Sequence, residues 1–542
     1  MLSILGFLVV LAPLVIVHEL GHFLFAKLFK VKAEVFSIGF GPRLFSKQWG
    51  ETEFRVAVIP LGGFVKLLGE EPGVELSETD KHRALQHQAA WKRFLIFFGG
   101  PLFNFLWAGF VFMLILLIGE PQISNQVSRI IQNSAASKIG LKSGDRILAI
   151  DDKAITKLDE FMQIISEKPG EKTTLKVQHL HSDLPVLINV VPETQSGYSS
   201  YGETKMLGHI DGIYPYARGL KIGVSNPKSV AGIAGIKTGY EAMELNGVQL
   251  STWEQLETVY QRLIPGKKIK FQYKDEIGQI KSTDFVVPST PRSPGEDLGL
   301  FASELFVDKP VEKAPAILAG IRSGDRMVSI DGVKVYGFGS LKEQIQKAGE
   351  TRGKVKVSWE REGKMMEADI VPQTTRDRDP ALNKIITHTI GIIPHLSYVE
   401  PDMVIERILN PFMLTYKGFE RMVIFTYRNF VSIGKIFSGD VSVSTLGGPI
   451  LIGKLAGDSL SRGLVAFLTT MAILSVGLGV LNILPVPVLD GGHLVLLGLE
   501  MIRGKALTIR QMEIVQQVGL SLILLLMVVV MKNDISRLAI FR

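Results

Sequence analysis

The sequence predicts a helical polytopic membrane protein with four membrane spans and a long β-rich segment between the second span and the third. Three observations support this prediction: four long apolar stretches, a metal-binding motif in the first of them, and an internal repeat in the segment between the second and third. The apolar stretches cover residues 1–29, 94–119, 463–489 and 514–531. Each reaches or approaches the roughly 20 residues that a helix needs to cross a bilayer.

Basic residues indicate the orientation of the spans. Lys27 and Lys81 are among many cations between the first and second spans, and Arg503 and Arg510 lie between the third and fourth. Positively charged loops favour the cytoplasmic side of a membrane. Both loops are therefore expected in the cytoplasm, and residues 120–462 are expected on the outer side.

The composition excludes several classes of protein. The chain has 542 residues, more than one domain requires, and a net charge of +7. We interpret this charge as the loop charge of a membrane protein, and we expect no nucleic-acid partner. The chain has no cysteine, which excludes disulfides, cysteine metal sites and cysteine nucleophiles. No basic stretch precedes the first apolar segment, so we expect it to remain as a membrane helix.

The first apolar stretch contains a His-Glu-x-x-His motif formed by His18, Glu19 and His22. Positions four apart share one face of a helix, so both imidazoles can point at one metal ion. Imidazole suits zinc, and Glu19 is placed to take a proton from a water molecule. A chance match is the alternative, but histidine and glutamate are costly inside a membrane and usually mark a functional site there.

A catalytic zinc site needs a third protein ligand. Asp490 is a lone acid that follows the uncharged residues 463–489, among prolines and glycines that break the helix. We predict that Asp490 is this ligand, with His493 as the competitor. His82 and His87 lie in a polar stretch and are expected to be solvated. The alternative for Asp490 is a simple turn-forming role before glycine.

Residues 53–68 predict a β-hairpin on the cytoplasmic side. Two partly alternating runs flank a turn signal that includes Gly62 and Gly63, and Phe64 begins the second run. Such backbone is tolerated at membrane depth only when it is buried in protein or lines a cavity. An ordinary surface hairpin is the alternative.

The outer segment contains an internal repeat. Residues 136–147 recur as residues 316–327, both with a Gly-Asp-Arg sequence followed by an alternating strand, and a weaker copy lies at 231–247. These α/β repeats resemble PDZ domains, and we assign them to residues 121–200, 201–295 and 296–375. PDZ domains bind extended peptides by adding a strand at a sheet edge. The alternative is a rigid spacer or size filter.

The remaining segments complete the predicted domain organisation. Residues 1–120 hold the first two spans with the motif and the hairpin, and residues 463–542 hold the last two spans. Residues 400–462 mix aromatic and aliphatic residues with charges. This pattern predicts amphipathic helices that lie on the outer membrane face or pack beside the spans.

Taken together, these motifs resemble the site-2 protease family of intramembrane zinc metalloproteases, in particular its bacterial regulator-of-sigma-E type. The resemblance implies that His18, His22 and Asp490 hold zinc and that Glu19 is the catalytic acid and base. It also implies that Asn482 positions the substrate and that the hairpin, with Gly62, Gly63 and Phe64, guides it. The matching motifs span nearly the whole chain in the family's order: residues 18–22, 37–42, 59–66, 100–105, 448–450 and 482–492.

One feature departs from the familiar members of this family, which carry two tandem PDZ domains where this chain has three repeats. The resemblance implies an intramembrane metalloendopeptidase of the bacterial inner membrane, with its PDZ-like repeats in the periplasm. Its substrates would be single-span membrane proteins of the anti-sigma-factor type or signal-peptide remnants. PDZ ligands or periplasmic regulators are further expected partners.

Two other classes of protein fit these motifs less well. A membrane scaffold with PDZ-like repeats and a decayed metal site would not need the intact set of His18, Glu19, His22 and Asp490. A metal transporter would need more intramembrane acids or histidines, and residues 94–119 offer none.

Overall fold

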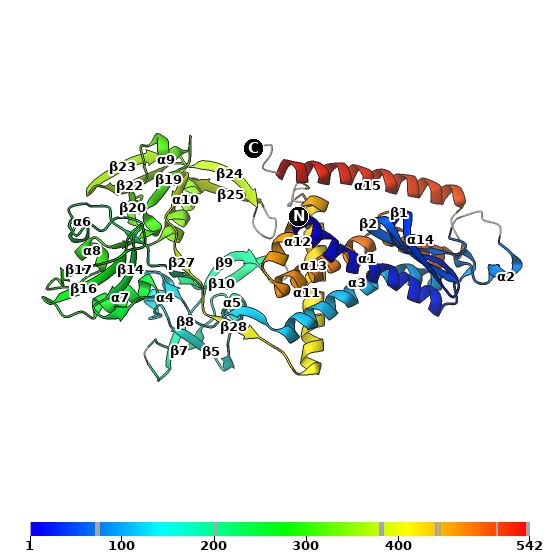
Figure 1. The fold of residues 1–542 in the computed structure, drawn as a ribbon, viewed down its shortest axis with the longest axis horizontal. Helices are drawn as coiled ribbons and strands as arrows, with labels where there is room; N and C mark the ends of the chain where they lie inside the picture. The colour runs from blue at the N-terminus through cyan, green and yellow to red at the C-terminus, as the bar shows by residue number, and fades with distance from the viewer. Residues whose placement is uncertain are drawn as a thin grey trace. The chain divides into compact units, whose positions relative to one another are not determined.

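The structure is a computed structural model in which the chain divides into two compact units. We call them the helical unit (residues 1–120, 200–203 and 405–542) and the β-rich unit (residues 121–199 and 204–404). The structure describes residues 2–70, 76–180, 182–199, 203–378, 384–439, 443, 446–505 and 508–537. Figure 1 colours both units along the chain.

Four helices of the helical unit are long and apolar enough to cross a membrane, as predicted. They are α1 (Leu2–Leu28), α3 (Ala90–Ile118), α13 (Leu464–Ile483) and α15 (Ile509–Arg537). The chain is thus a polytopic membrane protein with additional β-sheet domains. Two short helices, α2 (Glu78–Lys81) and η1 (Leu85–His87), precede α3.

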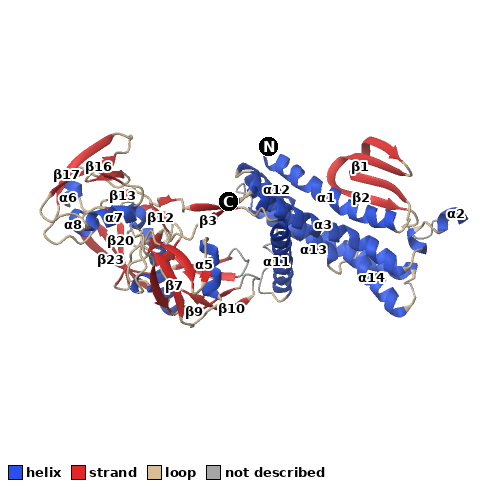
Figure 2. Ribbon diagram, turned by 90° about the horizontal axis from the view of Figure 1, so that it is seen from below, coloured by secondary structure: helices blue, strands red, loops and turns tan. Residues whose placement is uncertain are grey.

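Helices α1, α3 and α13 pack side by side (Figures 1 and 2). Leu14 of α1, Phe112 of α3 and Met471 of α13 belong to one buried apolar cluster. Gly21 and Gly99 set the closest approach of α1 to α3, because a Cβ atom on Gly21 would lie 2.1 Å from the Gly99 carbonyl oxygen. Small residues at such crossings let membrane helices approach closely.

The third span is shorter than the predicted range 463–489. Helix α13 ends at Ile483, because Pro485 and Pro487 cannot continue the hydrogen-bond pattern of a helix. A further helix, α14 (Asp490–Arg503), then begins at Asp490 and packs against α3. Arg93 of α3 and Glu500 of α14 form an ion pair.

The segment predicted to be amphipathic forms two helices that pack beside the spans. Helix α11 (Pro411–Phe437) crosses α3, with the ring of Phe425 stacked on Phe112 at 5.4 Å. Helix α12 (Pro449–Ser461) packs against α1 and α13. Asp534 of α15 accepts hydrogen bonds from the backbone N–H groups of Gly448 and Ile450 at the start of α12. It thereby satisfies donors that a helix N-terminus leaves free.

The predicted hairpin at 53–68 is one part of a longer structure. Strands β1 (Ala33–Trp49) and β2 (Thr52–Leu67) are joined at Gly50, whose φ of 62° permits a tight turn. The expected turn at residues 60–63 is instead a bend inside β2. Ile38 pairs with Gly63 on one side and with Val56 on the other, so the two bent strands make a curled sheet beside α1 (Figure 2).

The β-rich unit repeats one sheet topology three times, as the sequence repeat predicted. In each copy a strand pairs with the short strand after it and with the strand that follows a helix. The first sheet is β6 (Lys153–Ala154), β5 (Arg146–Ile150), β7 (Thr173–Gln178) and β8 (Val186–Val190). The second is β15 (Val248–Gln249), β14 (Glu241–Leu245), β16 (Lys268–Lys274) and β17 (Ile280–Val286). The third is β21 (Val333–Lys334), β20 (Arg326–Ile330), β22 (Val355–Arg361) and β23 (Lys364–Ile370).

Each copy also contains a short helix before its first sheet strand and a longer helix between its second and third sheet strands along the chain. The short helices are α4 (Ala135–Lys138), α6 (Val230–Ile233) and α9 (Pro315–Leu318). The longer helices are α5 (Leu158–Ser166), α7 (Trp253–Gln261) and α10 (Phe338–Arg352). The glycines after the short helices, Gly140, Gly235 and Gly320, have φ of 94°, 77° and 86°. These are left-handed conformations that glycine adopts without strain, which explains the constant Ala-to-Gly spacing of the repeats.

The aspartates of the two Gly-Asp-Arg sequences are structural. Asp145 is buried and pairs with His179 at 3.0 Å, and Asp325 pairs with Arg361 at 2.6 Å at the corresponding place. In the middle copy Tyr240 takes this position and stacks on another tyrosine ring at 5.9 Å. The middle repeat therefore keeps the fold while its loop is held by aromatic packing.

The cores of the repeats extend beyond the predicted boundaries of the first and third copies. The first core reaches Ile210, and the third core reaches Ile390. Each of these copies is completed by a hairpin that follows its sheet, and the middle copy has a short helix there. These elements are β9 (Glu193–Tyr198) with β10 (Thr204–His209), β24 (Gln373–Arg378) with β25 (Lys384–Thr389), and α8 (Pro294–Leu298).

Short strands connect the repeats or lie near the crossings between the units. These strands are β3 (Glu120–Ile123), β4 (Arg129–Ile130), β11 (Ile213–Tyr214), β12 (Ala217–Arg218), β13 (Ile222–Gly223), β18 (Phe301–Ala302), β19 (Val307–Pro310), β26 (Ile392–Pro394), β27 (Tyr398–Val399) and β28 (Met403–Glu406). A one-turn helix, η2 (Ser303–Leu305), precedes β19.

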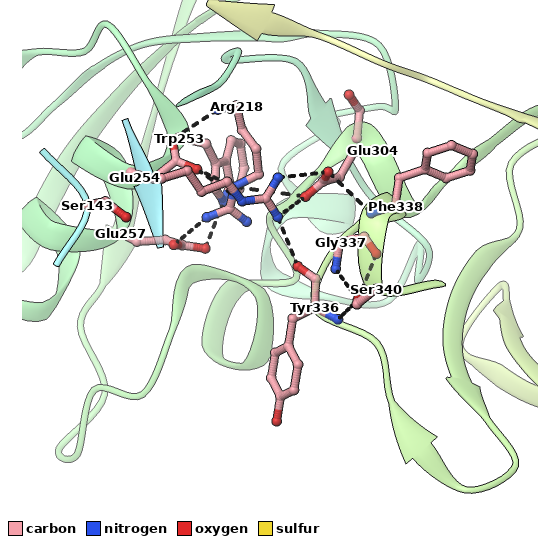
Figure 3. Close-up of polar contacts among 12 residues, drawn as sticks. Ser143, Arg218, Trp253, Glu254, Glu257, Glu304, Tyr336, Gly337, Phe338 and Ser340 are labelled. Carbon is pink, nitrogen blue, oxygen red and sulfur yellow. Dashed lines mark hydrogen bonds and ion pairs between the residues drawn. The ribbon is translucent and has the colours of Figure 1, made fainter. Parts of the chain in front are cut away.

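A buried ionic network joins the three repeats (Figure 3). Arg129 of the first repeat donates two hydrogen bonds to Glu304 of the third, at 2.6 and 3.0 Å. It also lies 3.7 Å from Glu254 of the middle repeat. Arg218 in turn contacts Glu254 and Glu257, both at 2.7 Å. The opposite charges of this network neutralise one another where their side chains are mostly buried. The network therefore links the three repeats to one another.

Candidate metal centre

His18 and His22 lie one turn apart on α1, and their rings face the same point. The two Nε2 atoms are 3.2 Å apart, and the ring planes are nearly perpendicular. Both side chains are almost buried, with exposed fractions of 11% and 12%. The helical spacing in the sequence is thus sufficient to bring the two imidazoles together.

Asp490, the first residue of α14, brings a carboxylate to the same point. Its Oδ2 lies 3.1 Å from His18 Nε2, and its Oδ1 lies 3.5 Å from His22 Nε2. Among the residues that the structure describes, these three form the one group of metal-ligating side chains whose ligand atoms lie within 4.8 Å of one another. The proline-induced end of α13 is what turns the chain so that Asp490 meets α1.

Glu19 follows His18 on α1 and lies beside the curled sheet. A Cβ atom on Gly63 would lie 3.1 Å from the Glu19 Cγ atom and 2.9 Å from Val15. Only a glycine therefore lets β2 pass this close to α1. Gly62 has φ of 141° and lies against the ring of Phe40, which stacks on Phe64 at 6.0 Å.

Helix α3 supplies a second layer behind the histidines, which sequence reasoning did not assign. His22 Nδ1 lies 2.8 Å from the Ile96 carbonyl oxygen, and His18 Nδ1 lies 3.0 Å from the Asn104 amide. A Cβ atom on Gly100 would lie 2.3 Å from His22 Nε2. The Gly-Gly-Pro-Leu-Phe-Asn run was visible in the sequence, but only the packing of α3 on α1 gives it this meaning.

The other candidate residues lie outside the cluster. His493 stacks on Phe97 at 4.4 Å with nearly parallel rings, so it faces α3 and not the other ligand atoms. His82 and His87 are exposed, as expected. Asn482 is half-buried in the last turn of α13, and its side chain makes no hydrogen bond with any described residue.

The donor set fits a catalytic zinc ion. Two imidazole nitrogens and one carboxylate are a set that catalytic zinc sites use, with a fourth position left for water or substrate. Each imidazole also has a partner on its far nitrogen, which is the usual support of a metal-bound histidine. Such a cluster, in a chain with four helices long and apolar enough to cross a membrane, defines the class of the protein, a membrane metallohydrolase.

Comparison with known proteins narrows this class. The family model described as peptidase family M50 matches residues 6–526. The chain is 29% identical to a Neisseria meningitidis protein named as a zinc metalloprotease, over 99% of both chains. It is 27% identical to the regulator of sigma E protease of Haemophilus influenzae, over 99% of both chains, and 27% identical to the regulator of sigma-E protease RseP of Escherichia coli, over 98% of both.

The chain belongs to peptidase family M50. It is therefore a metalloprotease with zinc as its cofactor, and it resembles the regulator-of-sigma-E type over its full length.

Proposed function

We propose that the protein is an intramembrane zinc metalloendopeptidase in which His18, His22 and Asp490 hold the metal and Glu19 is the catalytic acid and base. The convergence of the three ligand atoms within 4.8 Å, next to Glu19 on the same helix, is the observation that carries the proposal. Zinc at this place supplies Lewis acidity for the scissile carbonyl and for a water molecule. Glu19 takes a proton from the attacking water and returns it to the leaving amine.

The curled sheet is proposed to hold the substrate. A helix hides its amide bonds, so a transmembrane substrate must unwind before cleavage, and its exposed backbone groups then need partners. In the described part of β2, Gly63 and Phe64 pair with β1 on one side only, and Gly62 has no partner in the register. A strand added on the free side would run beside Glu19 and receive backbone hydrogen bonds. Asn482, half-buried with a free amide, is proposed to position this strand.

The protein is proposed to act in the bacterial inner membrane, with the loops next to the metal centre facing the cytoplasm and the β-rich unit facing the periplasm. Its substrates are proposed to be single-span proteins such as anti-sigma factors or signal-peptide remnants that another protease has trimmed. Two related proteins carry names that refer to sigma-E regulation. A role of this chain in regulated proteolysis during a stress response is part of the proposal.

The three repeats are proposed to be PDZ-like domains that act as a size filter. Strand β25 bonds to β24 on one edge, and its other edge faces α10. There Gln346 donates to the Ile386 carbonyl oxygen at 2.7 Å and accepts from the His388 N–H at 2.8 Å. A peptide that added to this edge would need the same two groups. The helix of the third repeat therefore occupies the place of an added strand, which favours a filter over peptide recruitment.

The test of the proposed chemistry is Glu19→Gln, which keeps the size of the side chain and removes its basic oxygen. We expect full zinc content and a loss of cleavage of at least about 100-fold, the usual contribution of a general acid and base. Purified protein is assayed for bound zinc and for cleavage of a single-span substrate in vesicles. Cleavage within tenfold of the unchanged protein would remove Glu19 from the mechanism.

A further inference from the structure

Asn104 of α3 is completely buried and touches the metal centre, yet half of its amide has no partner. Its Nδ2 lies 3.0 Å from His18 Nδ1, while its Oδ1 is buried without a hydrogen bond. A buried polar atom left without a partner costs about 1–3 kcal/mol, so the position needs a physical reason.

The arrangement of the histidines determines what His18 requires at this point. Its Nε2 faces the cluster, 3.1 Å from Asp490 and 3.2 Å from His22 Nε2. A nitrogen that binds zinc carries no hydrogen, so the other ring nitrogen, Nδ1, must carry it and needs an acceptor. His22 meets this requirement, because its Nδ1 faces the carbonyl oxygen of Ile96 at 2.8 Å.

The acceptor for His18 is the side-chain oxygen of Asn104. A half-turn about the Cβ–Cγ bond exchanges the oxygen and the amino group of an amide, which have nearly the same shape. After this turn Oδ1 receives the hydrogen of His18 Nδ1, and Nδ2 takes the place that Oδ1 occupied. One buried group of the amide stays without a partner, so its cost is the cost of orienting His18. Building on the ligand set proposed above, we propose that Asn104 is a positioning residue that holds His18 in the tautomer and orientation that bind zinc.

The packing of α3 explains why an asparagine stands here. Ile96, Gly100 and Asn104 are spaced four residues apart and so share the face of α3 that meets α1. The first supplies a carbonyl oxygen, the second clears space for both rings, and the third supplies the amide. Ser475 of α13 donates to the Asn104 main-chain carbonyl oxygen at 2.7 Å and is itself buried. Asn104 therefore contacts two neighbouring spans, α1 through its side-chain amide and α13 through its main-chain carbonyl oxygen.

The test compares two replacements of nearly equal size in the full-length protein in detergent. Asn104→Asp keeps an acceptor oxygen, and Asn104→Leu removes it. Zinc dissociation constants are measured by competition with a chromophoric chelator. We expect Asn104→Leu to weaken zinc binding about 10- to 100-fold, the usual effect of losing such a partner, and Asn104→Asp to bind zinc as tightly as the unchanged protein or more tightly.

Asn429→Leu is the matched control, because its amide donates to the Phe425 carbonyl oxygen within α11 and does not touch the ligands. Its zinc affinity should not change. Cobalt(II) bound in place of zinc gives a second readout, since its visible spectrum should change in Asn104→Leu and not in the control. If the leucine variant does not fold, Asn104→Ala takes its place in the comparison with Asn104→Asp.

Two outcomes would overturn the proposal. Zinc affinity unchanged in the folded Asn104→Leu or Asn104→Ala variant would mean that His18 needs no acceptor there. A loss in Asn104→Asp as large as in Asn104→Leu would mean that the amino group, and not the oxygen, faces His18. His18→Ala in the same assay tests the ligand set itself. Zinc binding that is intact in His18→Ala would mean that the proposed ligand set is wrong, whatever the Asn104 variants show.

Discussion

At the scale of single residues, the metal centre depends on glycines, which have no side chain, as much as on the metal-ligating side chains. Gly21, Gly63, Gly99 and Gly100 each stand where a Cβ atom would lie within about 3 Å of α1, of α3 or of the ligands. These contacts let two spans and a β-strand meet around His18 and His22. A glycine inside a helix costs up to roughly 1 kcal/mol of stability relative to alanine. The close packing around Gly21, Gly99 and Gly100 explains why glycine stands at these helical positions.

Gly100→Ala tests whether the missing Cβ atom of Gly100 leaves the space that the two imidazole rings need. The added methyl group would lie 2.3 Å from His22 Nε2 and 2.7 Å from His18 Cε1, so both rings must move. We expect zinc affinity to fall by at least about tenfold, as for other disturbances of the groups that orient metal ligands. Gly477→Ala on α13 is the control, because its nearest neighbour would be 4.0 Å away. Equal zinc affinity in both variants would contradict the interpretation that Gly100 leaves space for the two imidazole rings.

The choice of the third ligand is tested by comparing Asp490→Ala with His493→Ala. Asp490 reaches both imidazoles, whereas His493 stacks on Phe97. We expect Asp490→Ala to lose zinc and all cleavage, and His493→Ala to lose at most a small part of either, through weaker packing of α14 on α3. Metal analysis of the purified variants gives the ranking, and the reverse order would assign the site to His493.

At the scale of elements, the ionic network formed by Arg129, Arg218, Glu254, Glu257 and Glu304 determines how the repeats are joined. Arg129 has 6% of its side chain exposed and Glu304 has 3%, so neither charge can be solvated if its partner is removed. Breaking a buried pair on one side is strongly destabilising, whereas replacing both partners by apolar residues can be neutral.

Arg129→Met should therefore lower the free energy of unfolding of the β-rich unit by about 3–5 kcal/mol. It removes the two hydrogen bonds that the buried Glu304 accepts from Arg129 and leaves Arg218, 4.0 Å away, as the remaining cation. Denaturant unfolding of the full-length protein, followed by tryptophan fluorescence, measures the change. The double variant Arg129→Met with Glu304→Leu should recover a large part of the loss. A single variant as stable as the unchanged protein would show that the network does not hold the repeats together.

At the scale of the whole molecule, the proposed function assigns the chemistry to the helical unit and the control of substrate access to the β-rich unit. All the proposed metal ligands, together with Glu19, the curled sheet and Asn104, belong to the helical unit. The β-rich unit contributes none of these residues. Its removal should also be geometrically simple, because a Cβ atom on Gly119 would lie 2.6 Å from Ile405, where the chain returns to the helical unit.

We expect that replacing residues 121–404, which include residues 200–203 of the helical unit, by a short Gly-Ser linker leaves zinc content and Glu19-dependent cleavage of trimmed substrates intact. Untrimmed substrates with a folded outer domain should then be cleaved as well, since the proposed filter is gone. The assay compares both substrates at matched enzyme and zinc concentrations. Loss of cleavage of the trimmed substrate, with zinc retained, would instead favour recruitment by the repeats.

The sequence by itself determined the local features of this protein. Apolar length predicted the four spans, the spacing of four residues placed His18 and His22 on one helical face, and the repeated glycines predicted three similar domains. The sequence also indicates Asp490 as the third ligand, because a single acid among apolar residues needs a partner. These features depend on periodicity and on the cost of burying charge, which act over a few neighbouring residues.

Only the tertiary structure decided which segments, distant in the sequence, pack together to form the metal centre and the sheets. It placed the turn of the curled sheet at Gly50, ended the third span at Ile483, and brought Asn104 and Gly100 of α3 behind the histidines. It also joined Arg129 to Glu304 across the repeats. No local pattern encodes these contacts, because each depends on which faces of separate helices and strands pack together.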